Sequence, residues 1–436
     1  MRRAIGAALA ALLLLAAPAQ ASPQQEATFQ DDDLLVYADD AVVTQTLDEL
    51  RTLGVDRLRI SMVWRNIAPG NEEDKKPEGF DATDPGDYPD GAWSRWDRVV
   101  TLARERGMDV NFNITTPARD WATGSPARTD IDETYEPDAR EFGNFVRAAG
   151  RRYDGTGGRP LVTYWSLQNE PNQPGWLTPQ YVPQGDQWIE AAPRIYRAMV
   201  DQGYAALQAT GHGNDTILIG ETAPKGVSAR GETRAIDALR FIRRVYCLDD
   251  NLQVLRGAAA ESQGCRADGD LASFGADHPG LFKASGWAHH PYELTFAPNQ
   301  APRNPDWATM GNLPALQSML RRIHLRYGQP LQGDVPLFLT EFGYQSKPDD
   351  PLGVTRGQQA AYLNHAEYIA WRNRDVRTLA QFLLRDDDPP AGRTFQSGLR
   401  TNAGARKAAW SAYRFPIHVA RPTTRRGQLL RVWGLP

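Results

Sequence analysis

Leu161-Val-Thr-Tyr-Trp-Ser-Leu-Gln168, followed directly by Asn169-Glu170-Pro171, is the stretch that decides the fold of this chain. A run of about eight mostly apolar and aromatic residues predicts a buried β-strand. Parallel α/β folds place their chemistry at the carboxyl ends of such strands, which is where Glu170 stands. The stretch therefore predicts a parallel α/β fold with a functional residue at this edge.

Strand-like and helix-like segments alternate on both sides of this stretch. The expected strands are residues 34–37, 57–63, 109–114, 161–168, 216–220, 286–289, 336–340 and 377–383. The expected helices, with apolar residues three and four apart, are residues 42–53, 93–106, 138–152, 187–210, 233–246, 312–327, 356–372 and 403–414. Eight such pairs predict a closed (β/α)8 TIM barrel. An open doubly wound sheet would usually carry a glycine-rich phosphate loop after its first strand, and the sequence has none.

A second glutamate stands at the end of another expected strand, in Thr340-Glu341-Phe342-Gly343. Glu170 and Glu341 would follow the fourth and seventh strands and face each other across the barrel mouth. Two carboxyl groups about 5 to 5.5 Å apart are the arrangement that retaining glycosidases require. The alternative for either acid alone is a structural residue held in a salt bridge.

These two motifs resemble the signatures of the clan A glycoside hydrolases, most nearly the cellulase-like family 5 with some similarity to family 39. The resemblance covers about residues 30–415. It implies that Glu170 is the general acid/base and Glu341 the nucleophile. It also implies that Asn169 contacts the sugar 2-hydroxyl, an interaction that strengthens in the transition state.

Arg59, in the second expected strand, matches the arginine that lies under the nucleophile in this clan. Alternation along the strand places Arg59 and Ser61 on one face and Leu58 and Ile60 on the other, which is consistent with an inward arginine. A guanidinium close to Glu341 would keep that carboxyl ionised. A salt bridge at the base of the barrel is the alternative.

His290-Pro291-Tyr292 resembles the His-x-Tyr element of family 5. The resemblance implies that Tyr292 contacts the nucleophile and that His290 helps to bind substrate. The neighbouring His289 leaves open which histidine faces the site. Adjacent side chains diverge along a strand and no third ligand has suitable spacing, so no metal is expected.

Two positions depart from the family 5 pattern. Residues 111–117 lack the histidine that usually follows the third strand, and the eighth strand offers Gln381 and Phe382 where a stacking tryptophan is usual. The sugar platform should therefore differ, with Gln381 as a candidate binding residue. Trp121, Trp176 and Trp287 are the aromatic residues expected to stack on sugar faces.

Two acidic features have open roles. Glu221, after the fifth expected strand, could bind a sugar hydroxyl or only cap a loop. The run Asp386-Asp387-Asp388 is most simply a solvated loop, and the alternative is that it hydrogen-bonds sugar hydroxyls.

The termini and the cysteines bear on location. Residues 1–21 are expected to be a secretory signal peptide, because their apolar stretch is too short to span a membrane. Residues 22–415 are expected to form the barrel, and residues 416–436 a short basic extension. Loss of the signal would change the net charge from −4 to −6, which argues against nucleic-acid or anionic-membrane partners. Cys247 and Cys265 could form a disulfide, with two free thiols as the alternative.

The sequence as a whole predicts a secreted, monomeric retaining glycosidase that acts on a β-linked polysaccharide or oligosaccharide without a cofactor. A carbohydrate-binding barrel without catalysis and a transglycosylase are the alternatives. The sugar, and endo or exo action, are left open because specificity depends on loop shape.

Overall fold

The computed structural model describes residues 25–70, 75–329, 334–388, 395–419, 423 and 425–435. The predicted signal peptide lies outside the described residues. None of the helices in the described ranges is both long enough and apolar enough to cross a membrane.

Within the described residues, eight parallel strands close into a barrel in the order β1-β10-β9-β8-β7-β4-β3-β2. Their bounds are β1 (Glu26–Gln30), β2 (Arg57–Val63), β3 (Asp109–Thr115), β4 (Tyr164–Leu167), β7 (Thr216–Thr222), β8 (Gly286–His289), β9 (Leu337–Phe342) and β10 (Val376–Phe382). The predicted (β/α)8 barrel is confirmed.

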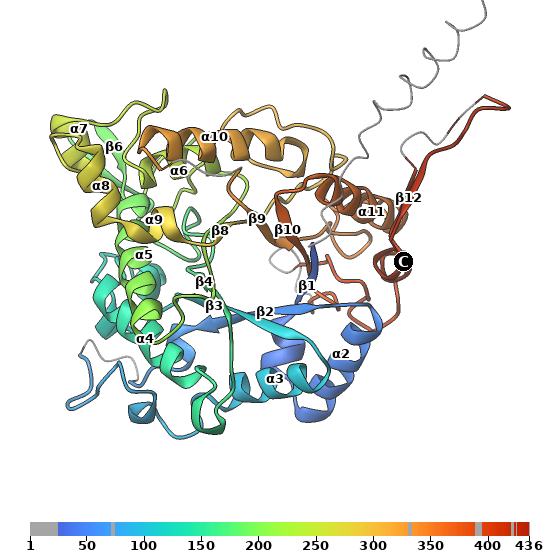
Figure 1. The fold of residues 1–436 in the computed structure, drawn as a ribbon, viewed down its shortest axis with the longest axis horizontal. Helices are drawn as coiled ribbons and strands as arrows, with labels where there is room; N and C mark the ends of the chain where they lie inside the picture. Colours follow the sequence, from blue (N-terminus) through green and yellow to red (C-terminus); the bar gives the residue numbers. More distant parts are fainter. Residues whose placement is uncertain are drawn as a thin grey trace, which may run out of the picture.

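Helices surround the barrel (Figure 1). They are α2 (Asp40–Thr52), α3 (Ser94–Glu105), α4 (Ala139–Arg152), α5 (Ala192–Ala209), α6 (Ala238–Val245), α7 (Gly257–Ser262), α8 (Leu271–Asp277), α9 (Pro279–Lys283), α10 (Leu313–Arg326), α11 (Arg356–Arg372) and α12 (Ala408–Arg414). Short turns of 3₁₀-helix lie in the loops: η2 (Trp64–Asn66), η3 (Pro85–Asp87), η4 (Asp120–Ala122), η5 (Thr129–Thr134), η6 (Thr156–Gly158) and η7 (Met310–Asn312).

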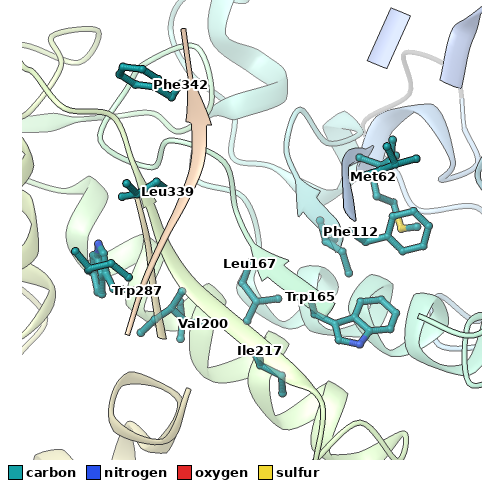
Figure 2. Close-up of a cluster of buried hydrophobic side chains, with 14 of the residues drawn as sticks. Met62, Phe112, Trp165, Leu167, Val200, Ile217, Trp287, Leu339 and Phe342 are labelled. Carbon is teal, nitrogen blue, oxygen red and sulfur yellow. The ribbon is translucent and has the colours of Figure 1, made fainter. Parts of the chain in front are cut away.

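The strands bury one face against the helices, and Figure 2 shows part of this layer. In β2, Leu58, Ile60 and Met62 belong to the large hydrophobic cluster, which leaves Arg59 and Ser61 on the inner face. A small second cluster of Leu218, Ala288 and Phe338 comes from three different barrel strands. The polar side chains on the inner face near the strand ends are therefore available to form a functional site.

The predicted first strand is wrong. Residues 34–37 lie in η1 (Asp33–Tyr37), a turn of π-helix in which the amide of Leu35 donates to the carbonyl of Asp31. The first barrel strand is β1, which pairs with β10 and β2. Its sequence, Glu-Ala-Thr-Phe-Gln, is mostly polar. The first strand was therefore predicted at residues 34–37, which are more apolar.

The predicted helix at residues 187–210 begins later than expected. Residues of β5 (Tyr181–Gln184) and β6 (Gln187–Glu190) form an antiparallel hairpin, and α5 starts at Ala192 with Pro193 in its first turn. Proline is well tolerated there because its missing N–H would have no helical partner.

Asp386 is not part of a solvated loop, which corrects the prediction for the acidic run. Its side chain is fully buried and accepts from Lys407 Nζ at 2.6 Å and from the amide of Gly398 at 2.9 Å. This ion pair fixes the segment that follows β10.

Two features lie outside the barrel wall. Cys247 and Cys265 are joined by a disulfide that links the segments after α6 and α7. In the predicted C-terminal extension, β11 (Ile417–Val419) pairs antiparallel with β12 (Val432–Gly434), and this sheet lies beside α11 (Figure 1).

Candidate active site

The two predicted acids meet at the mouth of the barrel. Glu170 follows β4 and Glu341 lies near the end of β9. One carboxylate oxygen of Glu170 and one of Glu341 lie within 4.8 Å of each other. Oxygens this close fit carboxyl groups roughly 5 to 5.5 Å apart, as in retaining glycosidases, better than groups roughly 6.5 to 9.5 Å apart, as in inverting enzymes.

Arg59 is fully buried and contacts both Glu341 and Asn169, the residue before Glu170. Its Nη1 donates to Glu341 Oε1 at 2.7 Å and also to Gln30 Oε1. Its Nη2 donates to Asn169 Oδ1 at 2.7 Å and to Glu221 Oε2 at 3.0 Å. The arginine is thus a fixed cation shared by strands β2, β7 and β9 and by the residue before Glu170.

His290, and not His289, faces the two acids. His290 Nδ1 lies 2.8 Å from Glu170 Oε1 and 3.6 Å from Glu341 Oε2. Its Nε2 lies 2.8 Å from Glu221 Oε2. Burial lowers the pKa of His290, but the charge of Glu341 and the hydrogen bonds to Glu170 and Glu221 together raise it to about 9. His290 is therefore an imidazolium at neutral pH, held between carboxylates.

His289 points into a different environment. Its Nε2 lies 2.8 Å from the carbonyl oxygen of Ala308 and its Nδ1 lies 2.8 Å from Thr222 Oγ1. Because a carbonyl oxygen only accepts, Nε2 carries the proton and Nδ1 accepts from the threonine. Burial lowers the pKa of His289 to about 4, so this histidine is neutral and structural.

Glu221 was left with two open roles by its sequence, and the structure places it at the centre of the network. Its side chain is fully buried and its Oε2 accepts from Arg59, from His290 and, at 2.6 Å, from Thr340 Oγ1. Burial raises the pKa of Glu221, but the Arg59 charge and the His290 hydrogen bond outweigh burial and lower it to about 2. Glu221 is thus a permanent buried anion.

The backbone at these strand ends is unusual. Gln168, Glu170 and Glu221 all have positive φ, at 67°, 31° and 45°, which is uncommon for residues other than glycine. The amide of Glu170 donates to the carbonyl of Glu221 at 2.9 Å. Such conformations persist where the surrounding structure fixes them, typically at functional sites.

Gly220 gives β7 the space it needs just before Glu221. Its φ is +106°, and a Cβ there would lie 2.5 Å from the Trp287 ring and 2.6 Å from the carbonyl of Ala288. Only glycine fits this position.

Tyr292 and Asn169 complete the contacts predicted around the acids. The Tyr292 hydroxyl donates to Glu341 Oε2 at 3.2 Å, and burial raises its pKa well above the usual value, so it stays a donor. Burial also raises the pKa of Glu341, against the lowering effect of the His290 and Arg59 charges. Asn169 lines the cavity, and because Arg59 occupies its Oδ1, its Nδ2 remains to donate to a ligand.

A cavity of about 420 Å³ opens over this network. Its size lies in the range of roughly 300 to 1,000 Å³ that is usual for small-molecule sites. The lining residues come from every strand end except that of β3: Gln30, Asp32, Ser61, Asn169, Glu170, Gln173, Trp176, Ala223, Pro224, Lys225, Tyr292, Glu293, Leu294, Glu341, Gly343, Gln345, Phe382, Phe395 and Ser397.

Of the three predicted stacking residues, Trp176 lines the cavity and the other two do not. Trp287 is 1% exposed and packs in the outer layer, with its Nε1 directed at Thr222 Oγ1 (Figure 2). Trp121 packs edge-on against Trp64 and donates to the carbonyl of Pro69. The burial of Trp287 corrects the prediction for that residue, and Trp121 lies outside the cavity lining.

Gln381 also does not line this cavity. It is buried, and its Nε2 donates to the carbonyls of Phe382 at 2.8 Å and Ser397 at 3.0 Å. It therefore holds the loop that carries Ser397, and the aromatic lining on this side comes from Phe382 and Phe395, whose rings pack edge to face at 5.2 Å.

Three charged lining residues were not among the sequence predictions. Asp32 accepts from Gln30 Nε2 and from the amide of Ser61, both at 3.0 Å, and the error in the first strand concealed its position. Lys225 and Glu293 form an ion pair at 2.9 Å on the Trp176 side. Their loops carry no motif that would have indicated this pairing.

Glu170, His290 and Glu341 could in principle offer three atoms to a metal ion. The Arg59 guanidinium lies 2.7 Å from Glu341, and a fixed cation at that distance would repel a metal ion. We therefore assign no metal to this site.

The chain is similar to known glycoside hydrolases. The family Cellulase (glycosyl hydrolase family 5) matches residues 24–377. A thermostable celloxylanase of Thermoclostridium stercorarium is 29% identical over 126 residues, which are 24% of this chain and 30% of the celloxylanase.

Solved structures share the fold. The GH39 enzyme from Xanthomonas axonopodis pv. citri superposes with a TM-score of 0.54 at 14% identity, over 90% of this chain and 66% of that one. GH5_18 from Streptomyces cattleya, in complex with GlcNAc, superposes with a TM-score of 0.52 at 15% identity, over 91% of this chain and 80% of that one. The predicted resemblance is confirmed by the family match, and the chain belongs to the cellulase family, glycosyl hydrolase family 5.

Proposed function

We propose that the protein is a retaining β-glycosidase that cleaves a β-linked polysaccharide or oligosaccharide, with Glu341 as nucleophile and Glu170 as general acid/base. The observation that carries the proposal is the separation of the two carboxylates, within 4.8 Å at their nearest oxygens. Carboxylates this close fit the retaining arrangement better than the inverting one, in which a water molecule must fit between the base and the sugar.

In the first step, a Glu341 oxygen attacks the anomeric carbon while the bond to the leaving oxygen breaks and Glu170 gives that oxygen its proton. In the second step, Glu170 takes a proton from water, the water oxygen bonds to the anomeric carbon, and the ester bond to Glu341 breaks. Arg59 and Tyr292 hold Glu341 with two hydrogen bonds that fix its direction of attack.

The other contacts fit a sugar ligand. Asn169 is placed to donate to the hydroxyl next to the anomeric centre, a contact that strengthens in the transition state. Trp176 offers an apolar ring to the C–H face of a sugar on the Glu170 side of the cavity. The disulfide supports an exported protein, because such bonds persist mainly in oxidising compartments.

Azide rescue tests the assignment of both acids. Aryl β-glycosides are the first substrates, with cello- and xylo-oligosaccharides beside them in view of the celloxylanase similarity. Glu341→Ala should lose hydrolysis, and azide should then give a product of inverted configuration. Glu170→Ala should lose activity most on poor leaving groups, and azide should give a product of retained configuration.

The alternatives predict other results. A binding protein would bind oligosaccharide but release no reducing sugar, and a transglycosylase would form longer products at high substrate concentration. Unchanged turnover in both alanine variants would refute the proposed roles.

A further inference from the structure

The two halves of the cavity offer different groups to a ligand. Glu170 must meet the leaving oxygen, so the leaving group extends toward the loops after β4 and β7, where Trp176 and Lys225 line the cavity. The sugar that becomes bound to Glu341, the glycone, then lies toward the ends of β10, β1 and β2, which are neighbours in the barrel. This glycone side is lined by Gln30, Asp32, Ser61, Phe382, Phe395 and Ser397.

Asp32 places a fixed carboxylate on the glycone side. Its Oδ1 accepts from the amide of Ser61 and its Oδ2 accepts from Gln30 Nε2, both at 3.0 Å. Gln30 is held in turn, because its Oε1 accepts from Arg59 and its Nε2 also donates to Ser61 Oγ at 3.3 Å. A carboxylate has about four acceptor positions. The oxygens of Asp32 can therefore accept further hydrogen bonds from two hydroxyl groups of one sugar.

The charges of the lining favour a neutral glycone. Within the described part of the chain, Lys225 is the one cation that lines the cavity, and it is on the leaving-group side, paired with Glu293 at 2.9 Å. A carboxylate on the glycone would therefore meet Asp32 with no lining cation beside it among the described residues. Two anions at close range in a partly enclosed cavity repel each other strongly.

Two departures from the family pattern make an acceptor at this place important. β3, whose end lacks the usual histidine, contributes no residue to the described lining. Gln381 directs its amide to the carbonyls of Phe382 and Ser397. Hydroxyl groups of the glycone must then find other partners, and hydrogen bonds to an ionised acceptor are roughly twice as strong as bonds between neutral groups.

We infer that Asp32 is a specificity-determining residue, which accepts hydrogen bonds from hydroxyl groups of the glycone and selects neutral sugars over uronic acids. The inference rests on the proposed function and narrows its substrate class. A site that hydrogen-bonds a substrate hydroxyl discriminates strongly against a substrate that lacks it, because the protein group is then left unpaired. Asp32 itself makes and breaks no bond in the reaction.

Substrates that lack one hydroxyl test the contact. The wild type is first assayed on the 4-nitrophenyl β-glycosides of glucose, xylose, galactose and mannose, and then on versions of the best of these with one hydroxyl removed at a time. Loss of a hydroxyl that Asp32 binds should lower kcat/KM by about ten- to hundredfold. In Asp32→Ala the same loss should change kcat/KM by no more than about twofold, because the partner is already absent.

This comparison separates recognition from a general loss of activity. Asp32→Ala also removes a partner of Gln30, which contacts Arg59, so it can lower the turnover of every substrate. The ratio of two substrates on the same variant cancels that common effect. Asp33→Asn is the matched control, because Asp33 is exposed and lies outside the cavity lining, and it should leave every substrate ratio as in the wild type.

A 4-nitrophenyl β-uronide with the ring configuration of the best neutral substrate tests the charge. The wild type should prefer the neutral glycoside, and Asp32→Asn should lower the ratio of the two kcat/KM values by about tenfold, because it removes the repulsion between two anions. If turnover of the uronide is below detection in both proteins, the series with single hydroxyls removed decides alone.

Hydroxyl losses of equal size in the wild type and in Asp32→Ala, or a wild type that prefers the uronide, would overturn the inference. Circular dichroism must show that Asp32→Ala folds; if it does not, Asp32→Asn is assayed on the same series and should show smaller losses than the wild type. None of these outcomes affects the azide rescue of the Glu341 and Glu170 variants. Failure of that rescue would instead refute the proposed function itself.

Discussion

Replacement of Arg59 by methionine should destabilise the fold strongly as well as abolish activity. The guanidinium is fully buried and donates to four side chains: Gln30, Glu341, Asn169 and Glu221. Methionine fills similar space but leaves the buried Glu221 carboxylate with only one cation, His290. Removing one partner of a buried ion pair typically lowers the free energy of unfolding by about 3 to 5 kcal/mol.

Urea unfolding at neutral pH, followed by tryptophan fluorescence, measures this loss. Arg194→Met is the matched control, because Arg194 pairs with Glu136 and both side chains are partly exposed, at 39% and 43%. An exposed pair contributes only about 0 to 1 kcal/mol. The double variant Arg59→Met/Glu221→Gln should recover part of the loss, since it removes the uncompensated anion.

The reasoning would be refuted if the free energy of unfolding of Arg59→Met lay within about 1 kcal/mol of that of Arg194→Met. It would also be refuted if the loss of unfolding free energy in the double variant equalled the sum of the losses in Arg59→Met and Glu221→Gln. Residues in direct contact are coupled, so their effects should not be additive.

Three other predictions follow from separate features. Trp176→Ala should raise KM for oligosaccharides by about tenfold through loss of stacking, whereas Trp121→Ala should leave KM near wild type in the same steady-state assay. Cys247→Ala/Cys265→Ala should lower the free energy of unfolding by about 3 kcal/mol, since the disulfide closes a loop with a sequence separation of 18, without changing kinetics at low temperature. Burial, opposed by hydrogen bonds from backbone amides, raises the pKa of Asp31 from 3.8 to about 7. The folded state therefore binds this proton more tightly than the unfolded state does. The resulting stabilisation is fully present below the unfolded-state pKa of 3.8 and is lost as pH rises through about 7. Between these pH values the urea midpoint should fall less in Asp31→Asn than in the wild type.

The sequence indicated the barrel and its two acids because both signals are local. Each acid stands close to the end of an apolar run, and alternation along residues 57–63 placed Arg59 on the inner face, where it contacts Glu341. These inferences needed only the strand period and the position of a residue relative to a strand end.

The alternation of side chains along β8 would have excluded Trp287 from the cavity. Ala288 belongs to a cluster of inner residues contributed by three strands, so its neighbour Trp287 must face the helices. The prediction for Trp287 rested on its residue type and not on the alternation of side chains along the strand.

The role of Glu221 could not be predicted from its neighbours in sequence. It depends on a positive φ that turns the side chain toward Arg59 and on the meeting of β2, β7 and β8, which are far apart in the chain. The first strand was hidden for another reason, since β1 is mostly polar and its burial comes from pairing with β10 and β2. Asp32 lies two residues beyond β1, so its place in the cavity lining was not predicted either.

Trapping of the covalent intermediate tests the proposed chemistry most directly. The protein is incubated with activated aryl β-glycosides that carry fluorine on the carbon next to the anomeric centre, which slows hydrolysis of the ester, and is then digested and analysed by peptide mass spectrometry. We predict one added sugar per chain, on the peptide that contains Glu341, and no label in Glu341→Ala. A label on Glu170 or Glu221, or none with any sugar that the enzyme hydrolyses, would contradict the proposed mechanism.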